Sequence, residues 1–119
     1  MHNFRNLDIW KDSMELTTKV YKLTADFPPN ERFNLTSQIR RCAVSIPSNI
    51  AEGAGRNTNP DFNQFLGIAT ASSYELETQL IIAQRLELIT VLELENIIAE
   101  LHSIQKRIYN FKQSIMRKG

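Results

Sequence analysis

The sequence predicts an all-α protein: an antiparallel, up-down-up-down four-helix bundle that forms a single domain over residues 1–119. Three observations predict this fold. The chain has only four glycines and four prolines, and most of them fall in two stretches between helical patterns. Apolar residues recur at steps of three and four along the segments that remain. The links between segments are short, so neighbouring helices are expected to run antiparallel.

The first helical segment covers about residues 7–25, and the prolines of FPPNERFN end it. Its predicted inner face is Leu7, Trp10, Met14, Thr17, Tyr21 and Thr24, widened by Leu16, Val20, Leu23 and Phe27. Asn34 is a suitable N-cap for the second segment. The apolar face of that segment is Leu35, Ile39, Cys42, Ala43, Ile46 and Ile50. Gly53 stands where a left-handed glycine would end the helix.

The third and fourth segments have the most regular spacing. Asn59, Pro60 and Asp61 fit the N-cap and acidic first turn of the third helix. Thr90 and Glu93 fit a capping box at the start of the fourth. The third seam is Phe62, Leu66, Ala69, Ser73, Leu76, Leu80 and Ala83. The fourth is Leu94, Ile97, Leu101, Ile104, Ile108, Phe111 and Ile115, a spacing typical of bundle packing.

Further apolar residues lie outside these seams. They are Phe4, Ile68, Ile81, Ile82, Leu88, Ile89, Ile98 and Tyr109. They indicate either a wide core stripe or a second buried face against another copy of the chain. The pattern alone favours neither interpretation.

Composition indicates an ordinary globular protein, with 42% hydrophobic and 23% charged residues. The net charge of +1 argues against a strongly cationic nucleic-acid binder of the usual kind. A single cysteine excludes an internal disulfide framework and favours a reducing compartment. The N-terminal residues lack the apolar stretch of a signal peptide, and no apolar run reaches the length of a membrane span. We therefore expect a cytoplasmic protein with no membrane partner.

The carboxylates and histidines do not form a metal-site pattern. A di-iron bundle needs Glu-x-x-His pairs on two helices, whereas His102 follows Glu100 at the wrong spacing. Two carboxylate pairs are two residues apart and therefore diverge around their helices: Glu75 with Glu77, and Glu93 with Glu95. We expect solvated charges at these positions, and no metal or cofactor.

Nucleophiles and glycines also lack a catalytic context. Ser45 and Ser48 have no lysine three residues later and no nearby histidine. Cys42 lies on the apolar stripe, which favours an inert core thiol. The glycines at 53 and 55 follow a helix and not a strand, so they do not form a phosphate loop. We expect the protein not to be an enzyme.

Pro47 interrupts the second helical pattern. Proline in a helix interior costs about 3 kcal/mol, so we expect a kink near Pro47 or an early end to the regular helix. Ser45 and Ser48 can bond to freed backbone groups, and Asn49 needs a buried partner. We interpret the stretch as a structural motif, made of Ser45, Pro47, Ser48, Asn49, Glu52 and Gly53.

The same stretch carries a family resemblance. The sequence contains F-R-x-L-x-I-W-K from residue 4, LTSQIRR at 35–41, SIPSNIAEG at 45–53 and ELETQL at 75–80. With these motifs the chain resembles the 23S rRNA intervening-sequence proteins, whose relatives include accessory proteins of diversity-generating retroelements. The match spans nearly the whole chain, and SIPSNIAEG is highly specific.

The resemblance implies an antiparallel four-helix bundle that assembles as a ring-like homopentamer and has no catalytic activity. For the retroelement relatives it implies binding to a reverse transcriptase and to nucleic acid. Two departures concern that binding. Residues 69–73 read ATASS where Arg-Gly-Ser is often seen, and the net charge is lower than that of the basic accessory proteins.

The bundle topology collects basic residues at one pole, where the first helix begins and the second and fourth helices end. That pole holds Arg5, Lys11, Arg56, Lys112, Arg117 and Lys118, against Asp8, Asp12, Glu52 and Asp61. Repetition around a ring would turn this pole into a rim that attracts the phosphates of structured RNA or DNA. The candidate nucleic-acid-binding residues are Arg5, Arg41, Arg56, Lys112, Arg117 and Lys118.

One alternative to this interpretation of the basic residues stays open. Basic residues at a helix C-terminus also complement the helix dipole. If that is their only role, the protein is a protein–protein scaffold that does not bind nucleic acid. Arg40 and Arg41 point in different directions on one helix, and at least one is expected to form a salt bridge within or between subunits.

Overall fold

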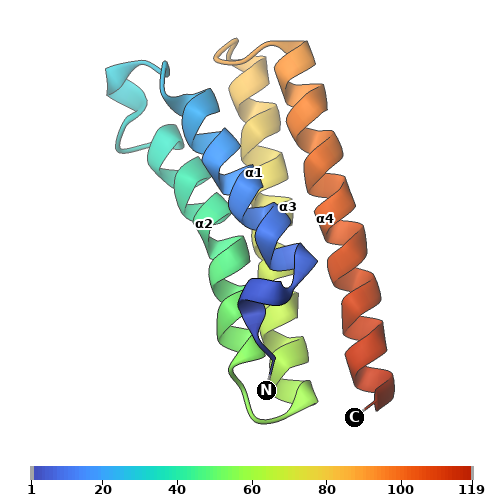
Figure 1. The fold of residues 1–119 in the computed structure, drawn as a ribbon. Coiled ribbons are helices and arrows are strands. Elements are labelled where there is room, and N and C mark those ends of the chain that lie inside the picture. The colour runs from blue at the N-terminus through green and yellow to red at the C-terminus, as the bar shows by residue number, and fades with distance from the viewer. Residues whose placement is uncertain (1, 119) are drawn as a thin grey trace.

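The computed structural model describes residues 2–118, and Lys118 only as the last residue of the final helix. The helices are α1 (Asp8–Thr24), α2 (Leu35–Ala54), α3 (Asn59–Arg85) and α4 (Val91–Lys118), with the short turns η1 (Phe4–Asn6) and η2 (Pro29–Glu31). Consecutive helices run in alternating directions along a body 46 Å long (Figure 1). The predicted all-α four-helix bundle is confirmed, and residues 2–118 contain no strand.

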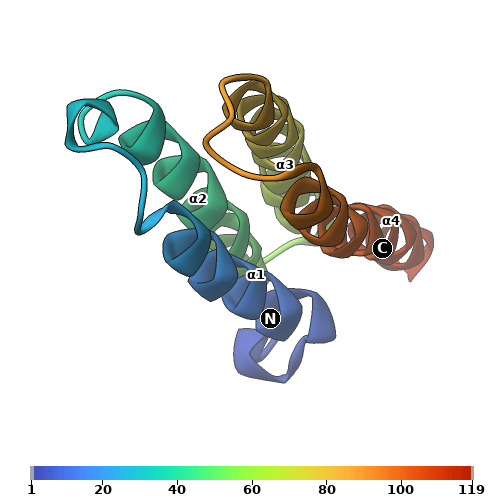
Figure 2. The ribbon, with the colours of Figure 1, turned by 90° about the horizontal axis from the view of Figure 1, so that it is seen from above.

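The four helices do not pack equally well. α2 and α3 form the most extensive contact, while α1 and α4 form the weakest of the four neighbouring pairs (Figure 2). Two ion pairs cross the α1–α4 seam, one between Lys19 and Glu100 and one between Asp12 and Arg107. Open hollows of about 490 and 200 Å³ line the same seam. The bundle therefore has one tight central pair and one loose side.

The seams of the third and fourth helices are confirmed. Every predicted seam residue of α3 is buried, and Leu66, Ala69, Ser73, Leu76, Leu80 and Ala83 have no exposed surface. On α4, Ile97, Leu101, Ile104, Ile108 and Ile115 are buried. Leu94 and Phe111 are half-buried against the core. Spacing alone identified these faces because the residues along each seam recur at steps of three and four without a gap.

The predicted inner face of the first helix is wrong in part. Met14 and Tyr21 are 42% and 41% exposed, whereas Leu16 and Val20, predicted only to widen the face, are fully buried. The true inner face of α1 is Ile9, Ser13, Leu16, Val20 and Thr24, continued by Phe27. The helix has apolar residues on two adjoining faces, and only its packing against the other helices selects between them.

Helix starts agree with the predictions at two of three positions. Thr90 and Glu93 form the predicted capping box, with bonds of 2.9 and 3.0 Å. Asn34 is the N-cap residue of α2, but its side chain makes no capping bond. Asn59 is not the N-cap of α3, because the Thr58 hydroxyl accepts the N–H of Asp61 instead. The Asn59 amide donates to the carbonyl of Ile115 and so joins α3 to the end of α4.

Gly53 does not end its helix, so that prediction is wrong. α2 continues to Ala54, and no glycine among the described residues has a positive φ. Gly53 is buried against α3. A Cβ there would lie 2.7 Å from Cδ1 of Phe62 and 2.8 Å from Cβ of Phe65. Glycine is needed because α2 and α3 approach each other closely at this point, and not for a left-handed turn.

Pro47 does not end the regular helix, because α2 runs on from Pro47 to Ala54. Proline lacks the N–H that would bond to the carbonyl of Ala43, four residues earlier. That carbonyl accepts a hydrogen bond of 3.1 Å from the Thr17 hydroxyl on α1. The Thr17 hydroxyl also lies 2.8 Å from the carbonyl of Ser13 in its own helix. A neighbouring helix thus satisfies the group that the proline leaves free.

The additional apolar residues divide between the core and the surface. Ile89 is buried, and Phe4, Leu88 and Ile98 pack against the core. Ile68, Ile81, Ile82 and Tyr109 remain 37–61% exposed. Other exposed apolar side chains include Val44, Tyr74, Leu86, Val91, Leu92 and Met116. A wide core stripe accounts for the first group only.

Candidate nucleic-acid interface

The predicted basic pole forms one end of the bundle. η1, the α2–α3 connection and the end of α4 meet there, together with both chain termini (Figure 1). Arg5, Arg56 and Arg117 are exposed at this end and Lys112 is half-buried. The side chain of Lys118 lies outside the described part of the structure. Four of the six candidate residues therefore occupy the predicted end.

Aromatic rings and a glycine position three of these cations. The guanidinium carbon of Arg56 lies 4.4 Å from the ring centre of Phe65, within the range of a cation–π contact. Arg5 lies 5.9 Å from the ring of Phe4, which packs edge-on against Trp10. The Lys112 ammonium extends past Gly67, where an added Cβ would lie 3.5 Å from Nζ.

These four cations form no ion pair within the described residues, where the ion pairs present are Lys19–Glu100, His102–Glu77 and Arg107–Asp12. Exposed carboxylates are present at the same end, on Asp8, Glu52 and Asp61. Asp61 shares a shallow hollow of about 330 Å³ with Arg56, Phe65 and Ile68. The pole therefore combines unpaired cations with a smaller number of acids, and its charge is modest.

Arg41 does not belong to this pole. It lies about 20 Å along α2 from Ala54, given a rise of 1.5 Å per residue. Its neighbour Arg40 forms no salt bridge within the described residues. The Arg40 guanidinium instead donates to the Thr24 hydroxyl and the Tyr21 carbonyl. Arg41, a predicted nucleic-acid-binding residue, therefore lies several helical turns from the other candidates.

The Ser45–Gly53 stretch forms part of the contact between α2 and α3. The Ser45 hydroxyl lies 2.8 Å from that of Ser72 on α3. The half-buried Asn49 amide donates to the carbonyl and hydroxyl of Ser45, at 2.8 and 2.9 Å. Ser48 and Glu52 are exposed. The interpretation as a structural motif is consistent with these contacts, although the partner of Asn49 is on its own helix.

Cys42 is the predicted core thiol. It is 6% exposed, and its sulfur lies 2.9 Å from a carboxylate oxygen of Glu75. Burial, followed by the hydrogen bond and negative charge of Glu75, raises the pKa of the thiol to about 12. The reactive thiolate is therefore scarce at neutral pH.

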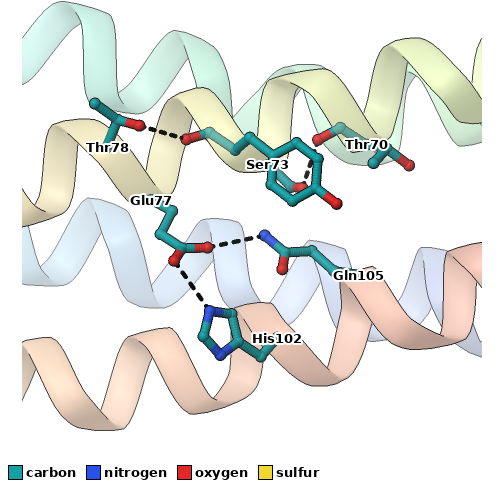
Figure 3. A network of polar contacts seen from close by, with 7 residues as sticks. Thr70, Ser73, Glu77, Thr78, His102 and Gln105 are labelled. Carbon is teal, nitrogen blue, oxygen red and sulfur yellow. Dashed lines mark hydrogen bonds and ion pairs between the residues drawn. The ribbon is translucent and has the colours of Figure 1, made fainter.

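A polar network joins α3 to α4 where we expected solvated charge. Figure 3 shows Glu77 between His102 and Gln105. Its two carboxylate oxygens lie 3.0 Å from the His102 ring nitrogen and 3.1 Å from the Gln105 amide. Burial alone would raise the pKa of Glu77, but the hydrogen bonds from His102 and Gln105 outweigh it and hold the pKa below its usual value of 4.5.

Because the lowered pKa favours the charged carboxylate in the folded state, Glu77 should stabilise the protein above pH 4.5. This contribution should be lost as the pH falls through the lowered pKa. We expect Glu77→Gln to be less stable than wild type near neutral pH, and the difference to shrink in acid. Urea unfolding of both proteins between about pH 6 and pH 3 measures this. A difference that does not change with pH would contradict it.

A second group of basic and aromatic residues, not predicted from the sequence, lies beside Arg41. A shallow groove of about 480 Å³ lies between the end of α1 and the start of α2. It is lined by Tyr21, Arg32, Phe33, Thr36, Ser37, Arg40, Arg41 and Val44. One feature of the sequence indicates this group: in FPPNERFN an arginine precedes a phenylalanine, and that aromatic residue lies in an otherwise polar link between helices.

A sequence model described as the 23S rRNA-intervening sequence protein matches residues 5–110 of the chain. The chain belongs to this family. The family match ends before Lys112 and Arg117, and it includes Arg5, Arg41 and Arg56. The basic pole therefore combines residues from inside and outside the matched range.

The structure of this intervening-sequence family member is similar to a crystal structure from Bacteroides thetaiotaomicron. That protein is described as one of unknown function from the S23 ribosomal protein family. The two chains are 27% identical, with a TM-score of 0.79, and the similarity covers 87% of this chain and 97% of the other. No curated protein matches the chain. Within the described residues, no helix is both long and apolar enough to span a membrane.

Proposed function

We propose that the protein is a non-catalytic, cytoplasmic homo-oligomer whose basic pole binds the phosphates of structured RNA or DNA. In this role it would act as an accessory to a nucleic-acid enzyme such as a reverse transcriptase. The observation that carries the proposal is a set of cations at one end of the bundle that form no ion pair within the described residues: Arg5, Arg56, Lys112 and Arg117.

Assembly is supported by the apolar side chains that the single bundle leaves in water. Ile68 and Ile82 on α3 are each 43% exposed, and Leu86 is 58% exposed. Ile68 and Ile82 are fourteen residues apart, and Leu86, the C-cap residue, follows four residues later, so the three lie on one side of α3 and form a second apolar surface. Burial between copies would remove that surface from water. The family resemblance leads us to propose a homopentamer.

A ring would give the modest pole a larger effect. Each copy contributes the same unpaired cations, and a closed ring places the copies in equivalent positions. Their potentials add over the rim and attract a polyanion more strongly than one bundle does. Contacts to phosphates carry no sequence information, so binding would be non-specific in sequence and would weaken steeply with salt.

The test is charge reversal at the pole. We expect Lys112→Glu with Arg117→Glu to reduce binding of duplex RNA and DNA at least tenfold, because each lost phosphate contact lowers affinity and salt dependence. Filter binding at about 50 and 200 mM salt measures both quantities. The matched control reverses Lys22 and Arg85, which are exposed and lie in the last turns of α1 and α3.

Sedimentation of the same proteins tests the assembly. All variants should keep the wild-type mass and helicity, since the reversed side chains are charged and not apolar. Unchanged affinity in the pole variant would exclude the pole as the binding surface. A mass equal to one chain at micromolar concentration would exclude the ring.

The second candidate is a protein–protein scaffold that does not bind nucleic acid. The net charge of +1 and the exposed apolar side chains favour it. In that case the basic residues at the end of α4 would serve only to complement the helix dipole. If the protein still assembles but retains neither RNA nor DNA on the filter at low salt, the scaffold is the correct function.

A further inference from the structure

The groove beside Arg41 lies at the opposite end of the bundle from the basic pole. The α1–α2 connection and the start of α2 form it, far from both chain termini (Figure 1). Three arginines and two aromatic residues are among the eight residues that line it, and none of the eight is acidic. A cationic surface with aromatic rings is typical of sites that bind single-stranded nucleic acid.

The three guanidinium groups have different roles in the groove. Arg40 is held in place, because it donates to the Thr24 hydroxyl at 2.9 Å and to the Tyr21 carbonyl at 3.2 Å. Its guanidinium carbon lies 4.5 Å from the centre of the Tyr21 ring, so the two side chains together form one wall of the groove. Arg41 is exposed and forms no ion pair or hydrogen bond within the described residues. It is free to meet a ligand.

Phe33 contributes almost nothing to the protein core. It is 84% exposed, the largest exposed fraction among the large apolar side chains of the described chain. The guanidinium carbon of Arg32 lies 5.4 Å from its ring centre. An exposed ring with an adjacent cation offers a face on which a nucleobase can stack and a charge for the adjoining phosphate.

The start of α2 lies beside the groove, and its first turn already has an acidic partner. The first N–H groups of a helix have no partners within the helix and attract negative charge. Glu31 satisfies one of them, since its carboxylate accepts the N–H of Leu35 at 3.4 Å. Thr36 is only 8% exposed, yet its hydroxyl oxygen has no hydrogen-bond partner within the described residues. Because that oxygen is buried and Glu31 occupies the helix start, the arginines and rings of the groove carry the inference.

We infer that this groove binds a single-stranded segment of nucleic acid. A base stacks on Phe33 beside the wall formed by Tyr21 and Arg40, and Arg32 and Arg41 bind the flanking phosphates. The inference rests on the proposed nucleic-acid function and adds a second site to it. The basic pole would hold duplex regions by charge alone, and the groove would hold an unpaired strand by charge and stacking.

Binding of labelled oligouridylate and oligothymidylate, followed by fluorescence anisotropy, tests the inference and separates RNA from DNA. We expect Phe33→Ala to weaken binding of either single strand about tenfold, because stacking on one ring is lost. Binding of an abasic strand of equal length should not change. Arg41→Gln should weaken binding of both strands, with and without bases. The matched controls are Tyr109→Ala, another exposed aromatic, and Lys106→Gln, another exposed cation.

The outcomes also separate the groove from the basic pole. If Phe33→Ala loses single-strand binding but keeps duplex binding, the groove is supported as the single-strand site. This conclusion does not depend on the behaviour of the Lys112 and Arg117 variants. Equal affinities of Phe33→Ala and Tyr109→Ala for the single strands would overturn the inference. So would a smaller sedimenting mass for Phe33→Ala or Arg41→Gln, because the groove would then be a contact between copies.

Discussion

Replacement of Gly53 by alanine is expected to lower the free energy of unfolding by about 2 kcal/mol, although alanine is the better helix former. The new Cβ would lie 2.8 Å from Cβ of Phe65, an atom fixed to the backbone of α3. It would also lie 2.7 Å from the buried ring of Phe62. α2 and α3 would have to separate, and this overpacking should exceed the gain of about 1 kcal/mol in helix propensity.

Gly67 provides the matched control. It lies inside α3, and a Cβ there would meet only the flexible end of Lys112, at 3.5 Å. We expect Gly67→Ala to leave stability unchanged or to raise it by up to about 1 kcal/mol. Urea unfolding should therefore separate the two variants by roughly 2–3 kcal/mol. Equal effects of the two substitutions would contradict the close approach of α2 to α3.

The second prediction concerns the carbonyl that Pro47 leaves free. Thr17→Val keeps the shape of the side chain but removes the hydroxyl that bonds to the Ala43 carbonyl. We expect it to lower the free energy of unfolding by about 1–3 kcal/mol, the usual range for a buried polar group left without a partner. Thr18→Val is the control, because the exposed Thr18 hydroxyl bonds only to Met14 in its own helix. It should change stability by less than about 0.5 kcal/mol.

A double-mutant cycle shows whether Thr17 acts through Pro47. Pro47→Ala restores an N–H that can bond to the Ala43 carbonyl. In that background Thr17→Val should cost at least about 1 kcal/mol less than in the wild type. If the two substitutions add without coupling, the Thr17 hydroxyl does not compensate for the proline.

The sequence predicted the elements whose pattern is complete within one helix. The seams from Phe62 to Ala83 and from Leu94 to Ile115 follow from spacing alone. The capping box of Thr90 and Glu93 is equally local, because both partners lie within four residues. Each of these features depends only on helix geometry, which the sequence order determines directly.

Features that depend on a second helix could not be predicted in the same way. A glycine near a helix end looks the same in sequence whether it forms a left-handed turn or allows another helix to approach closely. For Gly53, only the positions of Phe62 and Phe65 distinguish the two roles. The inner face of α1 could not be selected from the sequence, since apolar residues such as Met14 and Leu16 lie on both of its adjoining faces. The bond from Thr17 to Ala43 joins residues 26 positions apart.

In the candidate site, too, some positions followed from helix geometry and others depend on tertiary structure. Topology placed Arg5, Arg56, Lys112 and Arg117 at one end, because the direction of each helix fixes where its ends lie. Arg41 was named as a candidate on charge alone, and it is the seventh residue of α2, several turns from the pole residues. The groove around Phe33 depends on the path of the α1–α2 connection, which the helical pattern does not specify.

Because α1 and α4 make the weakest contact between neighbouring helices, the two sides of the bundle should differ in stability. α2 and α3 form a stiff spine, and the two outer helices are each attached to it along one flank. On the open flank, two exposed charge pairs join α1 to α4 above the shared core, and ionic strength screens them. Dissolved salt should therefore weaken this contact before it affects the apolar contact between α2 and α3.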